Sequence, residues 1–355
     1  METSWWSRIK WLVNVYRDLR KNTSPRTIAG RYIVIASMAS PALGLVINLT
    51  LPPNYYLGSL EITNGGVSLV TSTLCIMGFL LGTGLIYFDI RAELNHARKV
   101  ARVIISGLPG MSSSFPNDVL SKAEQRLARE PIELSFQEAD YEKQVERYNA
   151  EVCVDLFNRF VLHHQCEKLY IGGLARIPFL VAYGLFLRNV SNILYFDKIH
   201  RGANWKLLND EDLNIQLSNC EPLPKADENG DVGIALGLST PILKEHLPAK
   251  LQDVTSIITP TTKAERNLIL NQDNLQRISA TLSEMVDTLS REPEVKRIHL
   301  FLSVQSSLAI EIGRKFQEGI HKPWVIHNFD GTYGQYSWAL ELSRTGLELT
   351  NNNDA

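Results

Sequence analysis

Small, hydroxyl-bearing and basic residues follow several short apolar segments of the chain, where a strand would give way to a helix. Backbone N–H groups at such turns bind phosphate, and Lys and Arg neutralise its charge. Nearby aromatic rings can stack on nucleobases. The candidate ligand contacts are Gly107, Ser112, Gly173, Arg176, Lys198, Arg201 and Trp205 in one part of the chain, and Ser239, Thr240, Gln305, Ser306, Tyr333 and Tyr336 in another.

More residues of the same types lie beside these candidates. They are Ser113, Ser114, Gly172, His200 and Lys206 in the first part, and Ser307, Asp330 and Trp338 in the second. Taken alone, each residue also fits an ordinary turn or a packing aromatic. Cations concentrate in the first part and aromatics with hydroxyls in the second, so the site that they form would be chemically asymmetric.

The pattern favours binding over catalysis. The sequence has no GxSxG, no Walker A loop, no HExxH, and no GxGxxG in a strand-to-helix turn. His163 and His164 lie among polar residues of a predicted helix and indicate a solvated face, whereas His299 and His327 lie in predicted strands and indicate packing. The four cysteines show no CxxC spacing, which favours free thiols and no zinc. We therefore expect no catalytic residue, no metal and no cofactor.

The part of the chain after residue 100 resembles itself at a displacement of about 130 residues. KLYIGGLARIPFLVAYGLFL at 168–187 aligns with RIHLFLSVQSSLAIEIGRKF at 297–316, which places Gly184 on Gly313. Each copy predicts an apolar strand, a turn and a helix. A further strand follows in each copy, NILYFDK and PWVIHNFD, and an earlier one precedes, VARVIIS and DVGIALG.

The repeat predicts two Rossmann-like lobes, residues 100–208 and 231–355, joined by a polar linker at 209–230. Polar amphipathic helices are expected over 139–165 and 263–290. Strands that alternate with helices favour parallel or mixed sheets covered by helices. Since ligands bind outside the carboxyl ends of such strands, two related lobes would share one cleft. A ligand with internal pseudo-symmetry would suit that cleft.

Two uncharged runs precede the lobes. The best spans, residues 32–51 and 66–88, each reach the length of about 20 residues needed to cross a bilayer. Lys and Arg flank the pair on both outer sides and are absent from the connection at 52–65, so both chain ends are predicted to be cytoplasmic. A cleaved signal peptide or buried core helices would be alternatives. We predict a two-helix transmembrane hairpin within residues 31–99.

Small residues, the lack of charge and an amphipathic N-terminal segment refine the membrane prediction. Gly78 and Gly82 form a GxxxG pair that would let helices pack closely. Neither span holds Asp, Glu, Lys, Arg or His, so the charged pathway of a transporter is missing. Residues 1–30 predict an amphipathic helix lying on the cytoplasmic leaflet, with a soluble packed helix as the alternative.

Charge is distributed unevenly along the 355 residues. Residues 1–102 hold 11 Lys and Arg against 5 Asp and Glu, a net charge of +6, whereas the rest of the chain carries −8. The basic part suits an anionic lipid surface. The acidic part is an unfavourable partner for long nucleic acid, so a phosphate-bearing ligand must be met by a local group of cations.

The second copy is specific enough to suggest a family. HLFLSVQSSLAIEIGRKF, followed by KPWVIHNFDGTYGQYSWALEL, resembles the SAVED domain, the cyclic-oligonucleotide sensor in effectors of bacterial CBASS anti-phage systems. The resemblance covers most of residues 100–345 and is strongest over 299–342. Members often carry Pro in the turn where this chain has Gln305, which leaves that local ligand contact open.

The resemblance implies a membrane-anchored α/β protein with a SAVED-like tandem of two CARF-like lobes. It would bind a cyclic di- or trinucleotide made by a CD-NTase-type cyclase after infection. Ligand-induced homo-oligomers would then disrupt the lipid bilayer of the bacterial inner membrane and cause abortive infection. The alternatives are a membrane-anchored Rossmann-like enzyme, such as a cyclic-nucleotide phosphodiesterase or hydrolase, and a scaffold for protein partners.

Overall fold

The structure is a computed structural model, which describes residues 26–37, 69–98, 100–108, 114–128, 131–135, 140–153, 168–188, 190–199, 204–210, 214–218, 222–343 and 346–351. The chain divides into two compact units, Met1–His96 and Ala97–Ala355. Most of the predicted interfacial helix at 1–30 falls on residues outside the described ranges, as do Ser112 and Arg201.

The first unit contains one helix that could cross a membrane among the residues described. Residues 26–37 are helical, and the rest of the first predicted span, 38–51, lies outside the described ranges. The second span falls in α3 (Leu69–Arg98), in which Thr73–Ala92 is long and apolar enough for a bilayer. The large apolar side chains of this stretch that are more than half exposed are Leu74, Ile76, Met77, Leu80, Leu81, Tyr87 and Phe88.

Glycines bring the helix at 26–37 close to α3. A Cβ added at Gly82 would lie 2.8 Å from the carbonyl oxygen of Gly30 and 2.8 Å from Cγ2 of Val34. A Cβ at Gly78 would overlap the Ser37 side chain. Both glycines of the GxxxG pair therefore face a neighbouring helix of the same chain, at a contact too close for larger side chains.

Two charged side chains, Asp89 and Arg91, lie at the end of the apolar stretch Thr73–Ala92. The Thr27 hydroxyl donates a hydrogen bond of 2.5 Å to the carboxylate of Asp89, and both side chains are buried. Because the predicted span ended at residue 88, the sequence placed Asp89 just outside it. The pairing with Thr27 gives this carboxylate a partner inside the helix pair.

The second unit begins with a five-stranded sheet in the order β2-β1-β3-β4-β5. Its strands are β1 (Val100–Ser106), β2 (Ile132–Ser135), β3 (Lys168–Leu174), β4 (Ile193–Lys198) and β5 (Trp205–Leu207). All neighbours are parallel except β5, which pairs antiparallel with β4. The other elements of this lobe are η1 (Asn117–Val119), α4 (Lys122–Leu127), α5 (Tyr141–Cys153) and α7 (Ile177–Leu185).

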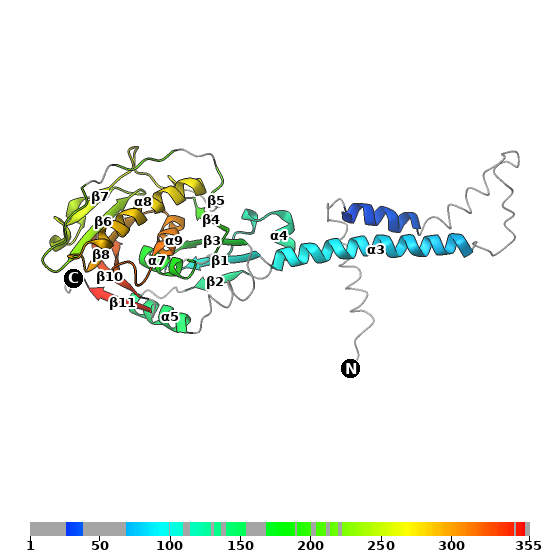
Figure 1. Cartoon of the computed structure of the whole chain (residues 1–355), viewed down its shortest axis with the longest axis horizontal. Coiled ribbons are helices and arrows are strands. Elements are labelled where there is room, and N and C mark those ends of the chain that lie inside the picture. Colours follow the sequence, from blue (N-terminus) through cyan, green and yellow to red (C-terminus); the bar gives the residue numbers. More distant parts are fainter. Residues whose placement is uncertain are drawn as a thin grey trace. The chain divides into compact units, whose positions relative to one another are not determined.

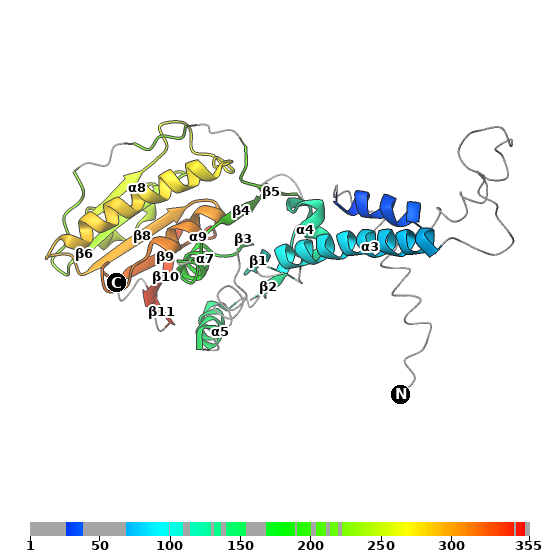
Figure 2. The same cartoon turned by 45° about the vertical axis from the view of Figure 1, so that its right-hand side comes forward.

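A six-stranded sheet follows, in the order β11-β10-β9-β8-β6-β7. Its strands are β6 (Asp231–Gly237), β7 (Thr255–Ile258), β8 (Arg297–Ser303), β9 (Trp324–Asp330), β10 (Gln335–Ser343) and β11 (Gly346–Asn351). The last two are antiparallel and the rest parallel. The lobe also has η2 (Lys244–His246), η3 (Ala249–Leu251), α8 (Gln272–Arg291) and α9 (Ser306–Lys315), and α8 crosses one face of the sheet (Figure 2).

The two lobes repeat one topology, as the sequence predicts. The order β2-β1-β3-β4 in the first sheet matches β7-β6-β8-β9 in the second. The helices that follow the central strands, α7 and α9, lie side by side between the sheets (Figure 1). They cross where Gly184 meets Gly313, since a Cβ on either glycine would lie 3.0–3.1 Å from the Cα of the other. The predicted alignment of these two glycines is thus confirmed by their contact.

One apolar cluster fills the space between the lobes. It joins the inner faces of both sheets to α5, α7, α8 and α9, and includes Phe179, Val181, Leu300 and Leu308, all fully buried. Burial of a large apolar side chain contributes about 1.5–3 kcal/mol. Separating the lobes would expose many such side chains, so the second unit behaves as one body with a fixed junction.

Two predicted helices differ from the observed ones. The helix predicted over 263–290 begins only at Gln272, because Asn271 caps it by accepting a 2.6 Å hydrogen bond from the Asp273 N–H. Residues 263–271 instead form an irregular segment with Ile269 buried. The helix predicted over 139–165 is observed as α5 up to Cys153, and residues 154–165 lie outside the described ranges.

Candidate functional site

The carboxyl ends of strands from both lobes border a cavity of about 450 Å³, here called the inter-lobe cavity. Its residues come from the ends of β1, β3 and β4 in the first lobe and of β6 and β8 in the second, together with the segment before α8. The lining is Leu108, Leu174, Asp197, Lys198, Ile199, Ser239, Arg266, Asn267, Val304, Gln305 and Ser306. This is the shared cleft that two related parallel sheets predict.

Asp197, near the end of β4, ties the first lobe to the start of α9 in the second. Its carboxylate accepts hydrogen bonds from the Ser307 N–H at 3.0 Å, from the Ser307 hydroxyl and from the Gln305 amide at 3.1 Å. Burial raises the pKa of Asp197, and these hydrogen bonds oppose the rise. The carboxylate therefore caps α9 across the lobe boundary, where the helix dipole favours negative charge.

Gln305 is the N-cap residue of α9, and its side-chain amide is fully engaged within the protein. Besides donating to Asp197, it donates to the Ile269 carbonyl at 3.0 Å and accepts from the Ile269 N–H at 2.5 Å. These bonds hold the segment before α8 against the turn after β8. Gln305 thus shapes the cavity wall, and a ligand would meet it only by breaking one of these bonds.

Free donors remain around this fixed turn. Lys198 Nζ and the hydroxyls of Ser239 and Ser306 have no hydrogen-bond partner among the residues that the structure describes. Arg266 adds a second cation, and Asn267 is held at φ 60° so that the chain turns at the rim. Two cations with adjacent hydroxyls suit a ligand that carries phosphate groups.

The cavity gathers Lys198, Ser239, Gln305 and Ser306 from the predicted candidates. Others lie near it without lining it. Gly107 donates from its N–H to the Leu174 carbonyl at 3.0 Å, Thr240 donates from its N–H to the Ser303 hydroxyl at 3.1 Å, and a Cβ at Gly173 would meet Ile105 and Leu180.

The predicted aromatics lie away from the cavity lining. Tyr336 is 3% exposed and packs edge-on against Phe301 at 4.9 Å, because the alternation of β10 turns it into the core. As a ligand contact it stays a prediction. Tyr333 is 76% exposed in the turn before β10. Trp205 packs edge-on against Phe196 at 5.4 Å.

Arg176 lies at the N-terminus of α7, the counterpart of the Gln305 position at α9. Its guanidinium donates to Gln144 at 3.3 Å and lies 5.9 Å from the ring centre of Trp338, which stacks on Tyr141. Burial lowers the pKa of Arg176, and the negative charge of Asp330 opposes that. Arg176 therefore contacts Gln144 of the first lobe and Trp338 of the second, and it is not part of the cavity lining.

Three residues that line the cavity were not among the predicted candidates: Asp197, Arg266 and Asn267. Asp197 directly precedes Lys198 at the end of a predicted strand, and that adjacency was a usable signal. Arg266 and Asn267 were hidden because they fell within the helix predicted over 263–290, whereas the structure has an irregular segment there. Among the described residues, no group of three or more His, Cys, Asp or Glu is arranged to hold a metal.

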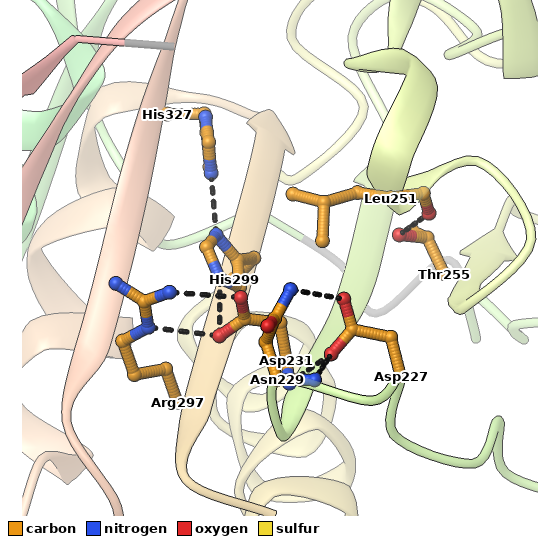
Figure 3. Close-up of polar contacts among 8 residues, drawn as sticks. All are labelled: Asp227, Asn229, Asp231, Leu251, Thr255, Arg297, His299 and His327. Atoms are coloured by element: carbon orange, nitrogen blue, oxygen red, sulfur yellow. Dashed lines mark hydrogen bonds and ion pairs between the residues drawn. The ribbon is translucent and has the colours of Figure 1, made fainter. Parts of the chain in front are cut away.

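The amino ends of the second lobe's strands carry a buried polar network, shown in Figure 3. Arg297 binds Asp231 through two bonds of 2.8 Å, and His299 Nε2 lies 3.3 Å from the same carboxylate. His299 Nδ1 lies 2.9 Å from Nε2 of His327, and both imidazoles are fully buried. The prediction that these are packing histidines is confirmed.

These features define a protein built from two Rossmann-like lobes that share a cavity at the carboxyl ends of their strands. The family described as "SMODS-associated and fused to various effectors sensor domain" (SAVED) matches residues 155–342, more than half of the chain. The chain therefore belongs to the SAVED family of sensor domains.

Solved structures provide distant relatives. The Acinetobacter baumannii Cap4 SAVED/CARF-domain containing receptor with the cyclic trinucleotide 2'3'3'-cAAA is 13% identical over 75% of this chain, with a TM-score of 0.46. The Moraxella osloensis Cap4 receptor is 14% identical, with a TM-score of 0.43. In both comparisons the match spans 58% of the receptor's own length. A sequence comparison with curated proteins gives no match.

Proposed function

We propose that this SAVED protein binds a cyclic di- or trinucleotide in the inter-lobe cavity. The observation that carries the proposal is the position of that cavity at the carboxyl ends of strands from both lobes, with Lys198 and Arg266 on its wall. Its volume of about 450 Å³ lies within the range of about 300–1,000 Å³ usual for ligand sites.

The chemistry of the wall suits such a ligand. Lys198 comes from the first lobe and Arg266 from the second, so two cations can meet phosphates at different places on a ring. The hydroxyls of Ser239 and Ser306 lie on the same wall and can donate to phosphate oxygens or base edges. Leu108, Leu174 and Val304 add apolar surface on which a base or ribose can pack.

We further propose that ligand binding drives the chain to oligomerise and disrupt the bacterial inner membrane, ending an infection before phage matures. The support is α3, whose large apolar side chains are exposed along Thr73–Ala92, and the basic residues that flank the apolar runs. Exposed apolar surface of this extent suits lipid or another helix. Both chain ends would be cytoplasmic, where a partner cyclase would supply the ligand.

Titration calorimetry on the full chain in detergent micelles tests the binding step. The probes are 2'3'3'-cAAA and 3'3'3'-cAAA, with which the Acinetobacter baumannii receptor has been solved, and a panel of cyclic dinucleotides. We expect micromolar or tighter binding of one ring, and none of the linear trinucleotide of the same bases. Recovery of unchanged ligand afterwards would separate binding from turnover. No binding of any cyclic nucleotide to folded protein contradicts the proposal.

Dye release from vesicles tests the membrane step. Chain reconstituted into phosphatidylethanolamine–phosphatidylglycerol vesicles should release dye when the identified ring is added. Gly82→Leu should reduce release several-fold, because the added side chain meets Gly30 and Val34, and should leave ligand affinity unchanged. Gly84→Leu is the matched control, since a Cβ there meets no neighbour within 4 Å. Ligand-independent release, or equal release by both variants, contradicts this step.

A further inference from the structure

The N-terminus of α9 opens toward the inter-lobe cavity, and an acidic side chain of the first lobe already occupies it. Asp197 accepts the Ser307 N–H at 3.0 Å and the Ser307 hydroxyl. It is 7% exposed and lines the cavity beside Gln305 and Ser306. A carboxylate with these donors is placed as a ligand phosphate would be at a free helix N-terminus.

Hydrogen bonds of the Gln305 side chain hold Asp197 in this position. Gln305 turns one amide hydrogen to Asp197 and the other to the Ile269 carbonyl, while its amide oxygen accepts from the Ile269 N–H. Each polar atom of the Gln305 side chain therefore has a partner, and these bonds hold Asp197 and Ile269 in place. A ligand that displaced Asp197 would leave several buried groups without partners, which is costly.

The cavity's free cationic group lies immediately beside this carboxylate in the sequence. Lys198 is half-buried, and its Nζ has no hydrogen-bond or ion-pair partner among the residues described. Arg266 supplies a second positive charge from the other lobe. An anionic ligand thus meets a wall with one fixed negative charge at α9 and positive charge elsewhere.

We propose that Asp197 is a specificity-determining residue that keeps phosphate away from the N-terminus of α9 and directs it toward Lys198 and Arg266. The inference deepens the proposed function and rests on it for the identity of the ligand. It predicts that a cyclic nucleotide presents a base or ribose, and not a phosphate, to the turn of Gln305 and Ser306. Rings whose phosphate spacing places an anion there would be rejected.

Inorganic phosphate tests the charge arrangement without a cyclic nucleotide. In Asp197→Ala the donors of Ser307 become available, and phosphate at about ten times its dissociation constant should raise the Tm of the full chain by about 4 °C. The wild-type chain should shift by less than about 1 °C under the same conditions. Asp253→Asn, which removes an exposed carboxylate of the second lobe, should behave as the wild type.

Asp197→Asn keeps the shape of the side chain and guards against an unfolded alanine variant. Loss of one negative charge should strengthen binding of the identified ring about tenfold, the Coulomb effect of two unit charges about 12 Å apart at an effective dielectric constant of about 20. It should also admit rings that the wild type rejects. A purely structural role would lower Tm and leave both ligand selectivity and the phosphate shift unchanged.

The two failures are distinguishable. If no cyclic nucleotide binds any variant but phosphate stabilises only Asp197→Ala, the proposed ligand is wrong and the role of Asp197 stands. If a ring binds the wild type, while Asp197→Asn shows unchanged affinity and selectivity and folded Asp197→Ala shows no phosphate shift, the role of Asp197 is overturned and the proposed function stands.

Discussion

At the amino ends of their central strands, the two lobes each form an ion pair, but from different residues. The strand register aligns Val100 opposite Lys168 in the first lobe, and Asp231 opposite Arg297 in the second. Arg297 binds the carboxylate of its neighbouring strand, but Lys168 has a valine there and binds Glu124 of α4 at 3.1 Å. The repeat therefore keeps an ion pair with a buried acid and a part-exposed base at this position, although the acid comes from a different element.

The helices that cross between the lobes differ in a second way. α7 is apolar throughout, whereas α9 carries Glu311 and Arg314. Glu311 accepts a 2.5 Å hydrogen bond from Tyr195 of the first lobe, and Arg314 donates to the carbonyls of Leu187 and Val190. The helix bordering the inter-lobe cavity is therefore fixed by directional bonds to the other lobe, and its counterpart mainly by shape.

Disrupting the contact between α7 and α9 should cause the largest loss in the free energy of unfolding. In Gly313→Val the new side chain would overlap the carbonyl of Val181 and approach the Cα of Gly184, both backbone groups. We expect a loss of about 3 kcal/mol or more in the free energy of unfolding, since neither helix can shift without opening the core. Guanidinium unfolding of the full chain in micelles, followed by tryptophan fluorescence, measures it.

The matched control is Gly331→Val, because Gly331 is exposed and a Cβ there meets nothing within 4 Å. It should change the free energy of unfolding by less than about 0.5 kcal/mol. Equal stability of the two variants would mean that the lobes do not meet at these glycines.

The amino-end ion pairs allow the lobes to be compared directly. Asp231→Asn should cost about 2–3 kcal/mol, because it leaves Arg297 and buried His299 without their acid. Glu124→Gln should cost about 1 kcal/mol, since Lys168 is partly exposed and the amide can still accept from Tyr170. The same unfolding assay measures both. A larger loss for Glu124→Gln would reverse the ranking of the two networks.

The pH dependence gives an independent test of the same pairs. Burial raises the pKa of Asp231, but hydrogen bonds from His299 and Arg297 outweigh it and hold the pKa well below its usual range. The pKa of Glu124 is lowered in the same sense by Ser121 and Lys168 against its burial. Their contributions are complete above about pH 4 and are lost as pH falls through the folded-state values. Asp231→Asn should flatten this acid slope more than Glu124→Gln.

The fold could be predicted from the sequence because the repeated segments show a strong apolar periodicity. The strands from Lys168, Asp231 and Arg297 are short apolar runs that end at glycine, serine or a turn, and two alignable glycines marked the helix crossing. The start of α8 could not be predicted in this way. Residues 263–271 have helical composition, but pairing of Ile269 with Gln305, which is distant in sequence, overrides local propensity.

The site could be predicted as a location and only partly as a set of residues. Strand ends found Lys198 and Ser306, because a parallel sheet places them at one edge. The positions of strand ends could not show that the Gln305 side chain is fully hydrogen-bonded within the protein, or that Tyr336 faces the core. Both features depend on partners in other elements. The role of Asp197 needed both lobes, because its donors lie more than 100 residues away.

Substitutions in the two lobes should weaken ligand binding to different extents. Lys198→Met should weaken the identified ring about twentyfold, the loss of one charge-assisted hydrogen bond in a half-buried site. Ser306→Ala, which removes a neutral donor of the second lobe, should weaken it about threefold. Calorimetry on the full chain measures both, with exposed Lys250→Met as the charge control. A stronger effect of Ser306→Ala would place the anionic part of the ligand against α9 and contradict the assignment of phosphate to Lys198 and Arg266.

A last prediction concerns the hydrogen bond from Tyr195 that holds α9 to the first lobe. Burial, together with the neighbouring Glu311, raises the pKa of Tyr195 well above its usual range, so its hydroxyl stays a donor. Tyr195→Phe removes this donor but leaves Glu311 paired with Arg314 at 2.6 Å, so we expect a loss of about 1 kcal/mol. Exposed Tyr333→Phe should cost nothing measurable in the unfolding assay. If Tyr195→Phe also costs nothing, shape alone positions α9, and the two crossing helices are held in the same way.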